Sequence, residues 1–334
     1  MSTYAIMADK MLQIGDQFDR YQIQAHMAQG GMSDIYRAFD LVNRREVVIK
    51  IPDPSMIGDP AQFERFQREL EVMTTLNHPT ILKGLGSGKY NRIPYLVTQY
   101  VDGQSLRKLI EDSAPLSPER AVSLIRKIAD GMAYCHKNNV IHRDLKPENI
   151  LITTDDQPVI MDFGLALTKG AHRVTYSNLS ATMGTPDYMA PEQIEGQRGD
   201  QRTDEYALGT ILYEMLAGKT PFTGDSNMAI MAQHLHNTAQ RLDWVNPLVS
   251  PQLAAIVATC LALDPEDRYA DMDALIDALD HPENLDVTIL EKLNHRPAHA
   301  TSLTQLQVIQ GILIAIGILG VLIILALGLQ YLQR

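Results

Sequence analysis

The residues best suited to chemistry lie in one short segment, residues 142–149, which read HRDLKPEN. Asp144 can accept the proton of an attacking hydroxyl group, and Asn149 follows five residues later with a side chain that can hold a metal ion. Asp162 opens an Asp-Phe-Gly triplet at 162–164 and adds a carboxylate, the hard oxygen ligand that Mg²⁺ prefers. A general base and two metal ligands therefore follow one another closely in the chain.

Two further segments frame this chemistry. Residues 47–50 read VVIK and place Lys50 at the end of a predicted strand, and residues 184–192 read GTPDYMAPE. Taken alone, a lysine in a strand is usually a solvated edge charge, and an aspartate before Phe-Gly is usually a turn residue. The combination, in this order, is far more specific than any of its members.

The elements that must position these residues begin with a β-rich part. Short β-like runs dominate from about residue 21 to residue 100, for example at 46–50 and 95–98. One helical run, at 60–76, interrupts them. These lengths predict a small lobe built around a sheet and a single helix.

A helical part follows after Gln104. Ser117, Pro118 and Glu119 form a helix start signal, with a capping hydroxyl, a proline in the first helical position and an acid in the first turn. Behind them apolar residues repeat at three- and four-residue spacing, which predicts a core-facing stripe. Further helices are predicted at 203–217, 227–236, 252–261 and 272–279. The layout is therefore a small β-rich lobe followed by a larger helical lobe.

Together, these segments match the protein-kinase signature set in order and context, and the chain resembles the eukaryotic-type (Hanks-type) serine/threonine protein kinases of bacteria. The resemblance covers about residues 21–280. It implies the α+β, two-lobed protein-kinase fold, with an N-lobe at 21–101 and a C-lobe at 102–280. It also implies transfer of the γ-phosphoryl group of ATP to Ser or Thr hydroxyls of proteins, with autophosphorylation, and Mg²⁺ (or Mn²⁺) as the metal cofactor.

The resemblance further implies roles for single residues of the small lobe. Lys50 would hold the α- and β-phosphates of ATP, and Glu69 on the predicted helix would pair with it. Glu64 and Glu71 are rivals for the partner of Lys50, although only Glu69 keeps the expected spacing to the end of that helix.

In the larger lobe, Asp144 would be the catalytic base and Lys146 would neutralise the transferred phosphoryl group. Asn149 and Asp162 would carry the metal ion. Lys146 and Thr185 both point to Ser and Thr, rather than Tyr, as acceptors.

The residues expected around the nucleotide come from the glycine-rich loop, the strand of Lys50 and the hinge between the lobes. They are Ala28, Gly30, Gly31, Ser33, Ile35, Val48, Lys50, Thr98, Gln99 and Val101. Ala28 and Ser33 replace two glycines of the family's pattern, and Val48 replaces its usual alanine. These departures keep an alternative open, a pseudokinase scaffold that binds nucleotide or partners without transfer. Against that alternative, all the catalytic and metal-binding residues are present.

The resemblance also implies supporting contacts. Glu192 would form a structural ion pair with Arg268, and Asp204 would brace the catalytic loop. His142 would pack beside Phe163.

The segment between Gly164 and Gly184 is rich in hydroxyl residues. The predicted phosphorylation sites are Thr175, Ser177, Ser180 and Thr182. A phosphate there would pair with Arg143, because three acceptor oxygens match a guanidinium fork. The alternative is that these are ordinary loop hydroxyls. A homodimer in the membrane plane would favour modification in trans.

A membrane anchor is predicted near the end of the sequence. Residues 311–329 contain no polar side chain, and the predicted transmembrane helix covers 308–329, enough to cross a bilayer core of about 30 Å. Lys292 and Arg296 precede it, which favours a single pass through the plasma (inner) membrane with the kinase domain in the cytoplasm. The remaining parts are an N-terminal arm at 1–20, a juxtamembrane linker at 281–307 and a short tail at 330–334.

The composition excludes other classes. Lys and Arg number 29 against 40 Asp and Glu, a net charge of −11, which argues against a nucleic acid as partner. Cys135 and Cys260 are too few for a disulfide framework or a four-ligand zinc site. The expected partners are ATP, protein substrates and the membrane.

Overall fold

The structure is a computed structural model, and it describes residues 12–29, 33–52, 66, 69, 71–91, 93–163, 167–168 and 186–294. Contacts within the chain divide it into two compact units, Met1–Val287 and Thr288–Arg334. Of the second unit the structure describes residues 288–294, which include helix α12 (Ile289–Asn294).

The predicted membrane span at 308–329 lies outside the described residues. Among the helices that are described, none is long and apolar enough to cross a membrane.

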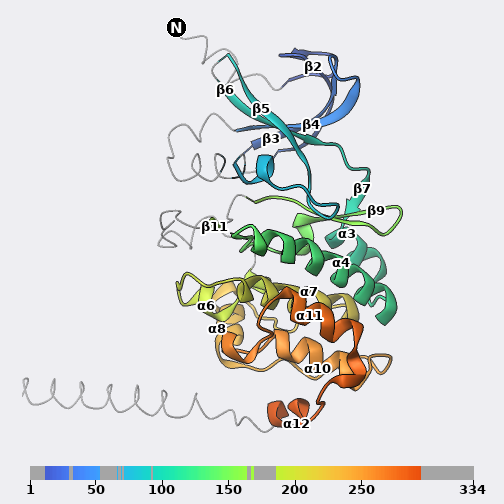
Figure 1. Cartoon of the computed structure of the whole chain (residues 1–334), viewed down its shortest axis with the longest axis vertical. Helices are drawn as coiled ribbons and strands as arrows, with labels where there is room; N and C mark the ends of the chain where they lie inside the picture. Colours follow the sequence, from blue (N-terminus) through green and yellow to red (C-terminus); the bar gives the residue numbers. More distant parts are fainter. Residues whose placement is uncertain are drawn as a thin grey trace, which may run out of the picture. The chain divides into compact units, whose positions relative to one another are not determined.

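The N-lobe is built on one curled antiparallel sheet (Figure 1). Its strands are β1 (Gln17–Phe18), β2 (Tyr21–Gln29), β3 (Ser33–Asp40), β4 (Arg45–Pro52), β5 (Gly84–Tyr90) and β6 (Ile93–Gln99). The spatial order is β1-β2-β3-β4-β6-β5. Of the predicted helix at 60–76, the structure describes helical residues at 66, 69 and 71–75.

Alternation along β4 decides which side chains reach the active site. Val47 and Ile49 are fully buried in the core of the N-lobe. Because successive side chains of a strand point to opposite faces, Val48 and Lys50 lie on the other face. The Phe18 and Tyr95 rings belong to the same core and meet edge-on, with their centroids 5.2 Å apart.

Two small sheets of short strands follow the N-lobe sheet in the chain. Strands β7 (Gly103–Ser105), β9 (Ile150–Thr153) and β10 (Pro158–Ile160) form a sheet in the order β10-β9-β7, and β8 (Val140–Ile141) pairs with β11 (Leu167–Thr168). β9 and β10 are a hairpin in which Ile150 faces Ile160. This register brings the residue before β9 and the residues after β10 side by side.

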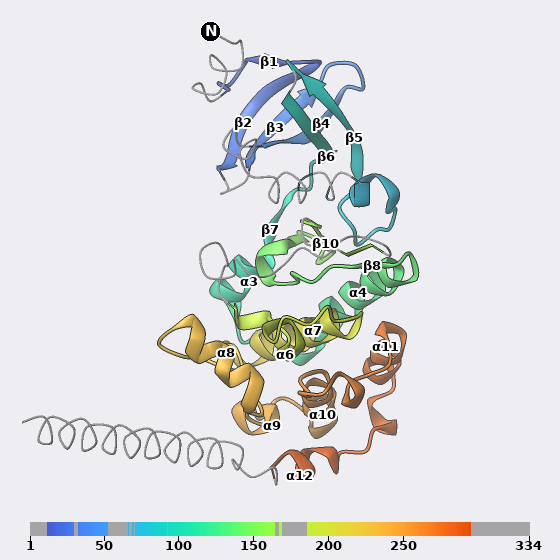
Figure 2. The ribbon, with the colours of Figure 1, turned by 90° about the vertical axis from the view of Figure 1, so that its left-hand side faces the viewer.

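The C-lobe is helical (Figure 2). Its α-helices are α3 (Leu106–Ser113), α4 (Pro118–Lys137), α6 (Pro191–Ile194), α7 (Arg202–Ala217), α8 (Asn227–His236), α9 (Leu242–Val245), α10 (Pro251–Cys260) and α11 (Met272–Asp280). Short 3₁₀ turns are η2 (Pro147–Asn149), η4 (Pro186–Tyr188), η5 (Pro265–Asp267) and η6 (Pro282–Asn284). The predicted division into a small β-rich lobe and a larger helical lobe is therefore confirmed.

Several helix bounds agree with the sequence prediction. The Ser117 hydroxyl caps α4 by accepting the backbone N–H of Arg120 at 3.3 Å, and α8 covers 227–236 as expected. The predicted helix at 203–217 is α7, which is buried along almost its whole length rather than on one face. Within the stretch predicted as a linker, 281–307, the structure has η6 and α12.

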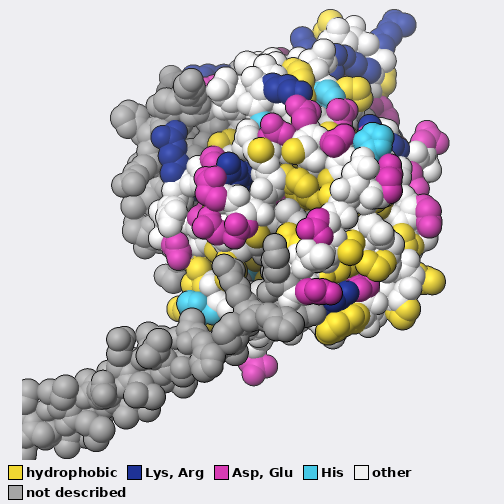
Figure 3. Space-filling model, turned by 60° about the horizontal axis from the view of Figure 1, so that its bottom comes forward, with side chains coloured by type: hydrophobic (Ala, Val, Ile, Leu, Met, Phe, Trp, Pro, Cys, Tyr) yellow, Lys and Arg dark blue, Asp and Glu magenta, His cyan; other side chains and the backbone are white. Residues whose placement is uncertain are grey.

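One face of the molecule reflects its acidic composition. Figure 3 shows a face on which Asp and Glu side chains are scattered, with hydrophobic side chains in small groups between them.

A buried carboxyl group in α7 departs from the pattern of an apolar core. Glu205 is almost fully buried, and its Oε1 accepts the backbone N–H of Tyr269 at 2.9 Å. Its Oε2 has no hydrogen-bond partner among the described residues. Burial raises the pKa of Glu205 to about 8, although the Tyr269 N–H and the charge of Arg268 act in the opposite direction. The carboxyl group is therefore largely protonated at neutral pH.

We expect Glu205→Gln to stabilise the protein more at pH 8 than at pH 5. The folded protein keeps this proton up to about pH 8, whereas the unfolded chain loses it near the ordinary pKa of 4.5. Stability is thus lost as the pH rises between these values, by up to about 1.4 kcal/mol per pH unit, and an amide has no such dependence. Urea unfolding across this pH range measures the difference.

The matched control is Glu111→Gln, at an exposed position of α3. Its stability should follow the parent at every pH. Parallel curves for Glu205→Gln and the parent would show that Glu205 is ionised in the folded state.

Candidate active site

An ion pair joins the sheet of the N-lobe to its helix. The Lys50 Nζ lies 2.6 Å from Glu69 Oε2, and both side chains are largely buried. Asp162 Oδ1 lies 3.9 Å from the same nitrogen. Burial alone lowers the pKa of Lys50, but the carboxylates of Glu69 and Asp162 outweigh it and raise the pKa above its ordinary value. Lys50 is therefore a fixed positive charge at the boundary of the two lobes.

The side chains of the catalytic loop converge on Asp144. Lys146 Nζ lies 3.0 Å from Asp144 Oδ2, and Asn149 Nδ2 donates to the Asp144 carbonyl oxygen at 2.8 Å and to Oδ2 at 3.1 Å. Burial lowers the pKa of Lys146, and the Asp144 carboxylate more than compensates, so that the pKa is raised. A partly exposed carboxylate flanked by a cation and an amide is suited to accept a proton from a hydroxyl group.

The β9–β10 hairpin places Asp162 beside Asn149. Asn149 directly precedes β9, and the backbone N–H of Met161 donates to the Asn149 carbonyl oxygen at 2.9 Å. The Asn149 amide nitrogen is used by Asp144, so its side-chain oxygen is the atom left to bind a cation. Together with the Asp162 carboxylate this is a hard oxygen donor set, which fits Mg²⁺ or Mn²⁺.

A buried aspartate holds the backbone of the catalytic loop. Asp204, in α7, has no exposed surface. Its Oδ2 accepts the backbone N–H of His142 at 2.9 Å and bonds His136 Nε2 at 2.8 Å, and its Oδ1 accepts the backbone N–H of Arg143 at 2.7 Å. Burial raises the pKa of Asp204, but these donors reverse the effect and lower it. The expected bracing of the loop is thus present.

Two residues of this region have a strained backbone. Arg143 and Asp162 have φ angles of 66° and 64°, the left-handed region that non-glycine residues rarely adopt. His142, next to Arg143 in the chain, contacts both neighbours of Asp162. The centroid of its ring lies 4.7 Å from that of Phe163, and its Nε2 lies 3.1 Å from the Met161 carbonyl oxygen. The packing of His142 beside Phe163 is as expected from the sequence.

Five of the residues predicted to surround the nucleotide share one face of the sheet. Ala28 faces Ile35 across the β2–β3 pair, Ile35 faces Lys50, and Val48 faces Thr98. Directly opposite residues point to the same side of a sheet, so these side chains lie on the face of Lys50. The other predicted members Ser33, Gln99 and Val101 lie at the start of β3, at the end of β6 and in the connection after it.

Gly30 and Gly31, Thr185, and the hydroxyl residues Thr175, Ser177, Ser180 and Thr182 lie outside the described residues. Their roles remain predictions.

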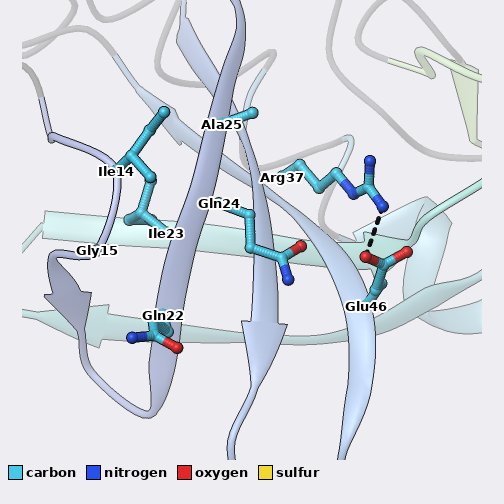
Figure 4. Close-up of a pocket in the computed structure, with 8 residues that line it drawn as sticks. All are labelled: Ile14, Gly15, Gln22, Ile23, Gln24, Ala25, Arg37 and Glu46. Atoms are coloured by element: carbon cyan, nitrogen blue, oxygen red, sulfur yellow. Dashed lines mark hydrogen bonds and ion pairs between the residues drawn. The ribbon is translucent and has the colours of Figure 1, made fainter.

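A hollow on the N-lobe lies apart from these residues. It has a volume of about 460 Å³ and is lined by Ile14, Gly15, Gln22, Ile23, Gln24, Ala25, Arg37 and Glu46. Figure 4 shows Arg37 reaching toward Glu46, to which it donates at 2.5 Å. None of the predicted site residues lines this hollow, so it is not the expected nucleotide site.

Contacts between distant segments add residues that the sequence reasoning missed. Arg107 in α3 donates to Glu148 at 2.8 Å, to Glu214 at 2.7 Å and to the Tyr188 hydroxyl. Glu148 belongs to the catalytic loop, so this cluster ties α3 and α7 to it. His136 is a second such residue. No motif marks these residues, because their partners are far away in the sequence.

The expected ion pair between Glu192 and Arg268 is present and buried. Arg268 Nη1 and Nη2 donate to Glu192 Oε1 and Oε2, respectively, each at 2.8 Å. The Thr203 hydroxyl donates to the same carboxylate at 2.9 Å. This pair fixes α6 to α7 and to the residue that follows η5.

The fold and this arrangement define a protein-kinase domain, and comparison with known proteins agrees. The sequence model of the protein kinase domain matches residues 21–282. The chain therefore belongs to the protein kinase family.

Curated relatives are named as serine/threonine kinases. The chain is 38% identical over 256 residues to serine/threonine-protein kinase PknL of Mycobacterium tuberculosis, covering 77% of this chain and 64% of that one. It is 36% identical over 255 residues to serine/threonine-protein kinase PknB of Mycolicibacterium smegmatis, covering 75% and 41%. It is also 36% identical over 260 residues to a probable serine/threonine-protein kinase of Streptomyces coelicolor, covering 77% and 39%. The matches thus span less than two thirds of these relatives.

Among solved structures, the kinase domain of Mycobacterium tuberculosis PknI superposes with a TM-score of 0.64 at 24% identity. The match covers 82% of this chain and 100% of that one. This likeness supports the fold.

We expect Asp204→Asn to destabilise the protein by about 3–5 kcal/mol, the usual effect of breaking a buried charged network. Asparagine has an NH₂ group in place of one carboxylate oxygen, so one of the backbone N–H groups of His142 and Arg143 would face a donor instead of an acceptor. Urea unfolding measures this loss. The control is Asp200→Asn, where an exposed Asp accepts the Arg202 N–H at 2.8 Å and Asn can do the same. Equal stability of the two variants would contradict the bracing role of Asp204.

Proposed function

We propose that the chain is an ATP-dependent protein kinase that transfers the γ-phosphoryl group to Ser and Thr hydroxyls of proteins, itself included. The observation that carries the proposal is the placement of two charged groups at the boundary of the lobes. One is the Lys50–Glu69 pair, and the other is Asp144 with Lys146 and Asn149 around it. The relatives named above support the choice of Ser and Thr.

Each of these residues has a distinct task in phosphoryl transfer. Lys50, kept charged and in place by Glu69, binds the α- and β-phosphates of ATP. Asp144 orients the acceptor hydroxyl and takes its proton. Lys146, 3.0 Å from Asp144, is close enough to the base to neutralise charge on the phosphoryl group as it moves.

A divalent cation completes this site. Asn149 and Asp162 would hold Mg²⁺ or Mn²⁺ through side-chain oxygens, as their adjacent positions on the hairpin allow. When bound, the cation supplies positive charge against the phosphates of the nucleotide.

The chain is also proposed to act at a membrane. In this arrangement 21–280 is the kinase domain, to which β1 (Gln17–Phe18) adds a strand from the stretch predicted as an arm, 281–307 joins this domain to the membrane, 308–329 is a single transmembrane helix in the plasma membrane and 330–334 is a tail. The kinase domain lies in the cytoplasm, where ATP is available. Encounter of two copies in the membrane plane would promote phosphorylation in trans, at Thr175, Ser177, Ser180 or Thr182.

We expect Asp144→Asn to reduce autophosphorylation, with Mg²⁺-ATP, by about a hundredfold or more, because the general base is lost. Lys50→Met should cause a comparable loss through the phosphate contact. Transfer of radiolabel from ATP measures both, and mass spectrometry of the labelled protein locates the modified hydroxyls. Lys83→Met, at an exposed lysine, is the matched control and should retain parental activity.

Radiolabel transfer, together with a thermal-shift measurement, distinguishes an active kinase from a pseudokinase scaffold. If the parent protein gains thermal stability with Mg²⁺-ATP but transfers no label, the pseudokinase alternative holds. In that case Ala28→Gly and Val48→Ala test whether the departures in the nucleotide site are responsible, since each restores the family's residue.

We expect the full-length protein to stay with the membrane through high-salt and alkaline washing, and to be released by detergent only. An apolar helix of about 20 residues anchors a protein irreversibly by comparison with surface binding. Immunoblotting of the fractions measures this. Truncation after residue 297 should yield a protein that needs no detergent, and release of the intact chain by alkali would contradict the anchor.

A further inference from the structure

Gln193 uses both ends of its side-chain amide in buried contacts. It lies in α6 and is almost fully buried. Its Oε1 accepts the backbone N–H of Ala190 at 3.1 Å, which caps the start of α6. Its Nε2 donates to the backbone carbonyl oxygen of Arg143 at 2.9 Å, fifty residues away in the sequence.

Arg143 is the place where such a contact matters. It directly precedes Asp144 and has the left-handed φ of 66°, a conformation that persists only where neighbouring groups hold it. Its backbone N–H is held by Asp204 at 2.7 Å. Gln193 holds the carbonyl group on the other side of the same residue. The strained unit is thus fixed at both of its backbone polar groups, from two different helices.

The support of Gln193 is itself rigid. The preceding residue, Glu192, is bound by two nitrogens of Arg268 and by the Thr203 hydroxyl. These contacts hold α6 in place, and Gln193 in turn binds the catalytic loop to α6.

We propose that Gln193 is a positioning residue for phosphoryl transfer: by binding the Arg143 carbonyl oxygen, it fixes the peptide unit that carries Asp144 at the angle the base needs. The proposal rests on the proposed kinase function. Gln193 also connects Ala190, the residue directly before α6, with Arg143, the residue directly before the base, because its side chain binds the backbone of both.

The first test is Gln193→Met, which keeps the length of the side chain but can neither donate nor accept these bonds. We expect kcat for transfer to fall by about tenfold to a hundredfold, since small misplacements of a catalytic group have effects of this size. The KM for ATP should stay the same, because Lys50 and the nucleotide face are untouched. A purely structural role would lower the melting temperature and leave kcat of the folded protein unchanged, which would overturn the proposal.

A second variant separates the two bonds of the amide. Gln193→Glu keeps an acceptor for the Ala190 N–H, so the cap of α6 survives, but its carboxyl group can donate to the Arg143 carbonyl oxygen only while it is protonated. We expect the kcat of Gln193→Glu, relative to that of the parent, to fall as the pH is raised and the carboxyl group ionises. A kcat ratio that stays at the parental value at every pH would show that only the cap matters. This variant also serves if Gln193→Met fails to fold.

The control is Gln201→Met. Gln201 likewise donates to a backbone carbonyl oxygen, that of Ala270 at 2.9 Å, but at the surface and away from the catalytic loop. Its kcat should equal that of the parent.

Hydrogen exchange distinguishes failure of this proposal from failure of the proposed function. In Gln193→Met, amide exchange of the peptide that covers residues 141–145 should speed up by at least about tenfold, whether or not the parent transfers phosphate. The same peptide should be unchanged in Gln201→Met. If the parent is inactive, the kinase proposal fails, and the exchange rates alone decide whether Gln193 holds the loop. Unchanged exchange in Gln193→Met would overturn the inference.

Discussion

The arrangement of the active site depends on one buried carboxylate. Asp204 sits in α7, the most deeply buried helix of the C-lobe, and a charge in that position is tolerated only if donors hydrogen-bond both of its oxygens. The donors are two consecutive backbone N–H groups of the catalytic loop and the ring of His136. The cost of burying the charge therefore dictates the path of the loop, and with it the place of Asp144.

Apart from the short turn η2, the loops that carry the chemistry lie outside the helices and strands. They are held instead by side chains from helices: Asp204 from α7, Gln193 from α6 and Arg107 from α3. The N-lobe contributes Lys50 to the site. Side chains alternate along β4, so that Val47 and Ile49 point into the core and Lys50 points to the site. This division lets the same short loops be exposed to substrate and yet fixed in space.

Local patterns and motif order account for the parts that the sequence could predict. The cap at Ser117, the helix at 227–236 and the strand of Lys50 follow from residues that are neighbours in the chain. The contact of Glu69 with Lys50 and that of Glu192 with Arg268 were expected from the family resemblance. The bonds of His136, Arg107 and Gln193 were not, because hydrogen bonds across 41 to 107 residues leave no local pattern. Such long-range polar contacts depend on the packed fold.

The antiparallel register of β9 and β10 has a consequence for how this site can change. Asn149 and Asp162 lie at the open end of one hairpin, whose far end is held by the two bonds between Arg120 and Asp156. A single residue inserted in either strand would shift the pairing and turn alternate side chains to the opposite face. The positions of the two oxygen donors are therefore coupled. Apart from Asp156, residues of the turn can be exchanged without moving them, but a change in the length of one strand has to be matched by the same change in the other.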